Sequence, residues 1–124
     1  MTSISNVEQA LENQMLSLAK LEIDAAPLPA WRDTFTASDE LSAQLKSLKV
    51  QAVDILLAGP VQIAPRIAPV VDGLNEEWLA LHSGMCEFRW KEAEQNAFSA
   101  AREQASRAIS DLGSLASQIL NADE

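Results

Sequence analysis

The chain has 124 residues, with 18 Asp and Glu against 9 Lys and Arg, and therefore a formal net charge of −9 at pH 7. This length suits one compact domain, and a hydrophobic content of 48 % is that of a globular protein rather than a disordered one. The acidic balance argues against direct nucleic-acid binding, because neutralising phosphates needs clustered Lys and Arg. A single Cys and a single His exclude an internal disulfide and any site that takes two histidines from one chain.

The first residues contain neither a basic stretch nor an apolar core of the length found in signal peptides. The longest apolar run, from Ile55 to Val61, has seven residues, whereas a membrane-spanning helix needs roughly 20. We therefore expect a cytoplasmic protein that does not enter a membrane, with export by a leaderless route as the alternative.

Gly and Pro divide the sequence into four segments that are all predicted to be helical. The chain contains 20 Ala and 16 Leu, both strong helix formers, but only 4 Gly. No stretch of useful length alternates apolar and polar residues as a half-buried strand does. The sequence therefore predicts an all-α four-helix bundle in a single domain, 1–124. Three shorter helices at about residues 5–24, 38–58 and 68–83 would precede one long helix at about 85–120.

The first helix is predicted from a capping box, in which Ser5 and Glu8 satisfy backbone N–H groups of the first turn. Pro27 and Pro29 end it, because proline lacks a donor and disfavours helix at the preceding residue. The linker after them carries Trp31. We expect this segment to cover one end of the core, and an exposed docking loop is the alternative.

The second helix is predicted to begin with Ser38 as its N-cap and to stop at the Gly59-Pro60 pair. Residues 60–69 contain three prolines and are expected to lie extended against the body of the protein. Pro69 suits the first position of the third helix, where its missing N–H costs nothing.

A seven-residue apolar repeat runs through the third helix and continues past Gly84. A continuous helix and a break at that glycine both fit this repeat, since one helical Gly costs only about 1 kcal/mol relative to Ala. We expect the break, because four short elements pack more easily than three of very unequal length. The last helix would then run from Met85 to Leu120 and span roughly 54 Å. It should overhang the other helices, bend near Gly113 or find a partner.

Small residues line one face of the last helix, at Ala93, Ala97, Ala101 and Ala105. Small side chains let two helix axes approach closely. This alanine seam is expected either to pack against the chain's own first or second helix or to pair antiparallel with a second copy across a two-fold axis. The expected overhang favours the second arrangement and hence a homodimer.

The candidates for site chemistry are His82 and Cys86, which are four residues apart and share one side of a continuous helix. Such a pair could act as a Cys–His nucleophile or as half of a zinc site. No second Cys or His completes a common ligand set, and a break at Gly84 would separate the two side chains. We therefore expect a buried structural thiol, and no catalytic residue, metal or cofactor.

Large side chains near the start of the last segment are the best candidates for a binding surface. Phe88 and Trp90 are two positions apart, roughly 200° on a helix, so both cannot lie on one narrow core stripe. One of them should face a second surface, and Trp and Met are enriched at interfaces. The interface candidates are Trp90, Phe88, Met85, Ala93, Ala97, Ala101, Ala105 and Trp31.

The sequence thus predicts a non-enzymatic protein–protein interaction module, such as an adaptor, assembly factor or small regulator, that acts through its C-terminal helix. One alternative is an acidic inhibitor that occupies a basic, nucleic-acid-binding site on a partner, because the net charge is −9. A second alternative is a small helical metal or thiol protein that uses His82 and Cys86.

Overall fold

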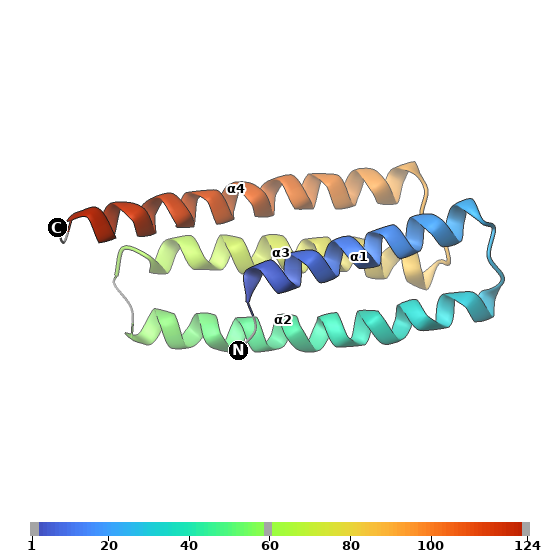
Figure 1. Cartoon of the computed structure of the whole chain (residues 1–124), viewed down its shortest axis with the longest axis horizontal. Coiled ribbons are helices and arrows are strands. Elements are labelled where there is room, and N and C mark those ends of the chain that lie inside the picture. Colours follow the sequence, from blue (N-terminus) through green and yellow to red (C-terminus); the bar gives the residue numbers. More distant parts are fainter. Residues whose placement is uncertain (1–2, 59–60, 123–124) are drawn as a thin grey trace.

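A computed structural model describes residues 3–58 and 61–122 of the chain. Four helices, α1 (Ile4–Ile23), α2 (Arg32–Ala58), α3 (Ala64–Cys86) and α4 (Glu92–Ala122), run alternately up and down the molecule (Figure 1). A short 3₁₀ helix, η1 (Leu28–Trp31), leads into α2. Within these described ranges the only regular structure is helical, and the prediction of an all-α four-helix bundle with one long C-terminal helix is confirmed.

The two ends of the bundle differ. At the end that we call closed, α1 and α3 finish while α2 and α4 begin; at the end that we call open, α1 and α3 begin and α4 finishes (Figure 1). α3 is the central element, because it packs against each of the other three helices. No helix in the described part of the chain has the length and apolar character needed to cross a bilayer.

α1 begins slightly earlier than expected and ends without a glycine. Ser3, not Ser5, is its N-cap, and the Ser3 hydroxyl accepts a hydrogen bond from the N–H of Asn6 at 3.1 Å. At its end, Ala25 adopts a left-handed conformation with φ of 48°. The N–H of Ala26 donates to the carbonyl of Leu21 at 3.0 Å, which closes the helix with a Schellman turn.

α2 begins six residues before the expected cap. Ser38 therefore lies inside the helix and is buried. The segment expected as a linker is instead the 3₁₀ turn and the first two turns of α2. Trp31 fills the closed end of the core with 3 % of its surface exposed, and its indole N–H donates to the carbonyl of Ala26 at 3.3 Å. The prediction that this segment covers one end of the core is confirmed.

α3 also begins earlier than expected, at Ala64, and the prediction that residues up to 69 lie extended is wrong. Pro65 occupies the first turn, where a missing N–H costs nothing, and Pro69 lies inside the helix. The burial of Ile67 and Val70 on the core side of this turn offsets the backbone hydrogen bond that Pro69 cannot make. The expected stop at Gly59 and Pro60 lies outside the described residues.

The boundary between α3 and α4 lies near Gly84, as predicted, but two residues beyond it. Gly84 stays helical, Cys86 is the last residue of α3, and the connection 87–91 leads into α4. The expected start of the last helix at Met85 is therefore wrong, since α4 begins at Glu92. Phe88, with φ of 52°, takes the left-handed position in a second Schellman turn, in which the N–H of Arg89 donates to the carbonyl of Gly84 at 2.8 Å.

α4 packs on α3, so the expectation that the alanine seam packs against the chain's first or second helix is wrong. The contact lies at the end of the seam, where Ala105 lies against Gly73 and Ala101 is also buried, whereas Ala93 and Ala97 are exposed. Phe98, which the periodicity did not single out, is buried on the same face as Ala101. α4 continues straight through Gly113, and its end projects beyond the starts of α1 and α3 (Figure 1). The predicted overhang is therefore present.

Candidate functional site

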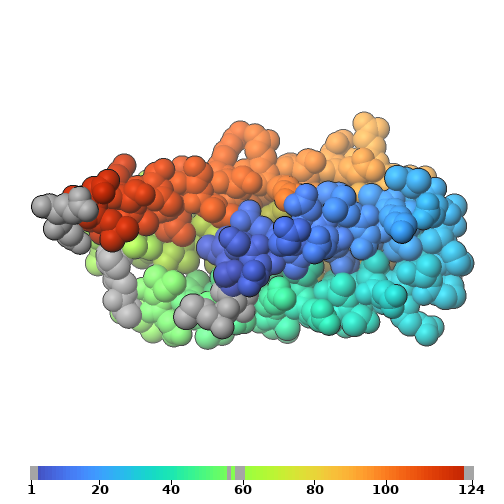
Figure 2. Space-filling model, in the orientation of Figure 1, coloured from blue at the N-terminus to red at the C-terminus, as the bar shows by residue number. Residues whose placement is uncertain are grey.

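Two ion pairs between α1 and α4 mark the antiparallel register of the two helices. Lys91 lies 3.1 Å from the carboxylate of Glu22 near the closed end, and Arg102 lies 3.2 Å from that of Glu12 further along. This register places Ile4, the first residue of α1, level with about residue 110 of α4. The last three turns of α4, roughly, therefore have no α1 beside them. Figure 2 shows α1 covering its face of the molecule only from the middle to the closed end.

An apolar cleft of about 210 Å³ lies where α1 begins. We call it the open-end cleft; its lining residues are Ile4, Leu48, Gln51, Ala52, Ile55, Ile67, Val70, Val71 and Leu112, so Gln51 is the one polar member. α2 supplies one wall, α3 the floor and α4 the other wall. The side chain of Ile55 is 47 % exposed at its edge. This is the concave, mostly apolar kind of surface that binding sites present.

The projecting end of α4 continues the apolar character of the cleft. Leu112, Leu115 and Ile119 are half-buried and succeed one another at spacings of three and four residues, which keeps them on one helix face. Leu120 is 68 % exposed beside them. This stripe therefore keeps part of its apolar surface exposed to water beyond the start of α1.

The residues chosen from sequence as interface candidates divide between core and surface. Trp31, Met85, Trp90, Ala101 and Ala105 are all buried inside the bundle. Those that remain at the surface are Phe88, Ala93 and Ala97. Phe88 is 41 % exposed and Trp90 only 2 %, so the two do face different environments, but because they lie in the connection 87–91 and not on a helix.

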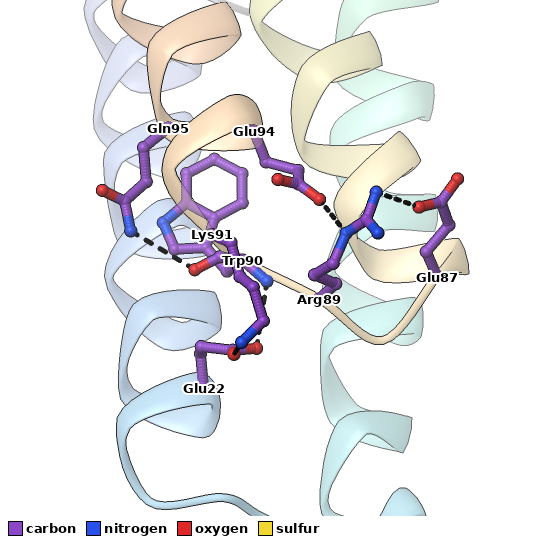
Figure 3. Close-up of polar contacts among 7 residues, drawn as sticks. All are labelled: Glu22, Glu87, Arg89, Trp90, Lys91, Glu94 and Gln95. Atoms are coloured by element: carbon purple, nitrogen blue, oxygen red, sulfur yellow. Dashed lines mark hydrogen bonds and ion pairs between the residues drawn. The ribbon is translucent and has the colours of Figure 1, made fainter.

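A polar cluster closes the end of the bundle opposite the cleft (Figure 3). The carboxylate of Glu22 accepts a hydrogen bond from the backbone N–H of Trp90 at 3.1 Å, and this bond, together with Lys91, holds the pKa of Glu22 below its usual range. Arg89 pairs with both Glu87 and Glu94. The hydrogen bond that Arg89 donates to the Glu94 carboxylate holds the pKa of Glu94 below its usual range. Each acid here contacts a cation or an N–H group, although Oε2 of Glu94 is buried without a hydrogen-bond partner. These contacts join the connection 87–91 to α1 and α4, which is typical of a structural role.

Glu77 is a buried carboxyl group outside this cluster. Only 3 % of the residue is exposed, and burial raises the pKa of its carboxyl to about 7, against the opposing charge of Arg102. Glu8 on α1 adds to the rise. Glu77 therefore lies under the space between α1 and α4, where a negative charge is poorly solvated.

His82 and Cys86 are brought together, as a continuous helix requires. The Cys86 Sγ lies 3.4 Å from Nε2 of His82, and the thiol is exposed, so the expectation of a buried structural thiol is wrong. Trp78 stacks on the imidazole with ring centroids 4.8 Å apart. The other ring nitrogen, Nδ1, is buried and has no hydrogen-bond partner. A Cys–His nucleophile normally has a third group to orient the base, and this pair has none at Nδ1.

Among residues 3–58 and 61–122, no group of three or more His, Cys, Asp and Glu side chains is gathered closely enough to hold a metal ion. The sequence matches no protein-family model, and neither the curated proteins nor the solved structures include a significant match to it.

Proposed function

We propose that the chain is a non-enzymatic helical interaction module that docks a helix of another chain at the open end of its bundle. The observation that carries this proposal is the open-end cleft, which is lined almost entirely by apolar side chains. It lies where α1 begins, several turns before the end of α4 is reached. Amphipathic helices bind other proteins by laying an apolar face into such a groove. A helix that continued the line of α1 would complete the fourth position of the bundle at this end.

The apolar stripe at the end of α4 supports the same arrangement. Leu115 and Ile119 lie beyond the first residue of α1 and are only half-buried in a single chain. A second helix alongside would remove their remaining surface from water, which is worth about 25 cal/mol for each Å² of apolar area. The C-terminal helix would thus act as the docking element that the sequence predicted.

The partner we propose is a second copy of the chain. Each copy carries both complementary parts, the cleft and the projecting apolar end of α4, close to one another. Two copies placed open end to open end across a two-fold axis would lay each projecting end beside the other copy's cleft. Such an isologous contact closes on itself and gives a homodimer.

The acidic-inhibitor alternative has less support. Its mechanism needs an unbroken acidic ridge, whereas acids along and beside α4 alternate with Arg89, Lys91 and Arg102 in ion pairs. These pairs interrupt the negative surface that a basic partner would recognise.

Light scattering on a sizing column, over a hundredfold concentration range, tests the proposal. The wild-type chain should have twice its 13.4 kDa mass. Ile55→Glu at the rim of the cleft and Leu120→Glu on α4 place charge in the contact, and both should reduce the mass to that of one chain. Both side chains are at least 47 % exposed, so the fold should tolerate the change.

Leu16→Glu is the matched control, because Leu16 is an equally exposed leucine on α1 away from the cleft. This variant should keep the wild-type mass. A wild-type chain that stays at the monomer mass throughout, or a Leu16→Glu variant that dissociates as fully as Ile55→Glu, would contradict the open-end homodimer.

A further inference from the structure

His82 and Cys86 form a pair of metal-ligand side chains at the closed end, far along the bundle from the open-end cleft. Both side chains project from the last turns of α3, one turn apart, with Cys86 exposed to solvent. Trp78 stacks on the imidazole, and its indole N–H donates to the hydroxyl of Ser38 on α2 at 3.1 Å. The His82 ring is therefore fixed between two helices and does not turn freely.

The spacing of the two donor atoms matches that of neighbouring ligands in a tetrahedral zinc site. Zinc binds thiolate sulfur at about 2.3 Å and imidazole nitrogen at about 2.0–2.1 Å. At a tetrahedral angle these bond lengths separate sulfur and nitrogen by about 3.6 Å. The observed separation between Sγ and Nε2 is 3.4 Å. Nδ1 is buried, so Nε2 is the nitrogen that faces a ligand at the surface.

One chain supplies only these two ligands, because the described residues contain no larger group of suitable side chains. A closed zinc site needs four ligands, and two Cys with two His are a common set. We propose that His82 and Cys86 from two copies of this chain together bind one Zn²⁺ ion, so that zinc joins two bundles at their closed ends. The site is incomplete without the second copy.

The charge balance of this site is favourable. Zn²⁺ bound by two thiolates and two neutral imidazoles is an uncharged complex, and the two thiol protons are released to solvent. Two chains with a net charge of −9 each repel one another. At physiological ionic strength that repulsion is screened over about 8 Å, whereas the metal–ligand bonds are short and unscreened.

Cobalt is a suitable probe, because Co²⁺ takes the same tetrahedral sites and acquires a visible absorption with a thiolate charge-transfer band. A titration under reducing conditions should saturate at one Co²⁺ for two chains, and added Zn²⁺ should bleach the spectrum. Cys86→Ser and His82→Gln should each weaken binding at least tenfold. Glu87→Gln is the control, because Glu87 is an exposed neighbour that pairs with Arg89 and takes no part in the proposed site.

Mass measurements in zinc are made on the Ile55→Glu variant, so that contact at the open end does not contribute. Zinc should raise its mass from one chain to two, and a chelator should reverse the change while reductant excludes a disulfide. One metal per chain with no change in mass would overturn the proposal, as would a Cys86→Ser variant that binds Co²⁺ like the wild type. Either result leaves the open-end proposal standing, since that proposal needs no metal.

Discussion

Gly73 on α3 lies directly against the backbone of Ala105 on α4: a Cβ atom added at residue 73 would lie 2.7 Å from the Cα of Ala105. Backbone, not a flexible side chain, occupies that space, so nothing local can yield to a methyl group. Glycine is therefore required at residue 73 by packing against α4, although it is a poor helix former.

Gly73→Ala should destabilise the protein by about 1–2 kcal/mol, because the overpacking cost exceeds the gain in helix propensity. Gly113 provides the matched control, since a Cβ there would have no neighbour within 4 Å. Gly113→Ala should stabilise by up to about 1 kcal/mol. Urea unfolding followed by circular dichroism measures both variants. If the two substitutions shift the midpoint in the same direction, the close approach of α3 and α4 is wrong.

Ala25→Gly should stabilise the protein by about 0.5–1 kcal/mol. Ala25 adopts φ of 48°, a region that costs a residue with a Cβ about 1–2 kcal/mol. Glycine removes that strain, but part of the gain in stability is lost because glycine loses more conformational entropy on folding than alanine does. The neighbouring Ala26→Gly has no such strain to relieve and should destabilise. Thermal melts of the two variants distinguish them, and a destabilised Ala25→Gly variant would contradict the Schellman turn.

Glu77 should make the protein less stable as the pH rises from about 4.5 to 7. Its carboxyl has a pKa of about 7 in the folded chain against an ordinary value of 4.5, so the folded state binds more protons in this window. Ionisation of the Glu77 carboxyl in the folded protein therefore lowers the free energy of unfolding by up to about 3 kcal/mol at pH 8.

Glu77→Gln should remove this pH-dependent loss of stability. The variant should be more stable than wild type at pH 8 and about equally stable at pH 4.5. Urea unfolding at four pH values, with Glu76→Gln as the exposed neighbouring control, measures the difference. A constant difference between Glu77→Gln and wild type across this range would show that the carboxyl titrates normally.

Ala97→Leu should leave the self-association of the chain unchanged. Ala97 is exposed on α4, and the open-end contact lies several turns away, at Leu112 and beyond. If two copies paired instead through the alanine seam, a leucine at this position would hold their helices apart and reduce the dimer. Light scattering separates the two arrangements.

Much of the fold could be predicted from the sequence, because the apolar spacing and the prolines after α1 are local signals. The first residues of the helices were harder to predict. Residues 32–37 carry no cap pattern and become helical because Trp31 is buried at the closed end. Pro65 and Pro69 suggested an extended segment, yet burial of Ile67 stabilises a helix through them. Ala25 and Phe88 end helices at positions where a glycine would have been the readable signal.

The candidate site was predictable in outline only. The overhang of the last helix results from the helix lengths, and it is the source of the open-end cleft. The lining of that cleft depends on where α1 begins relative to α4. This register arises from the packing of both helices on α3, which cannot be predicted from local sequence signals. The pairing of His82 with Cys86 was predictable from their spacing, but the break expected at Gly84 argued against it. Gly84 is instead needed for close packing, because a Cβ atom there would lie 2.6 Å from the carbonyl oxygen of Arg89 in the connection that follows α3.

The central position of α3 also sets an order of opening within the bundle. α3 packs against all three other α-helices, whereas α1 is the shortest of the four α-helices in the described residues and borders the cleft. Segments with few buried contacts open locally at a lower free energy than the core of a domain. Backbone amides in the middle of α3 should therefore be the slowest to exchange with deuterium, and those in the first turns of α1 among the fastest. Occupation of the open end would slow the exchange of α1 first.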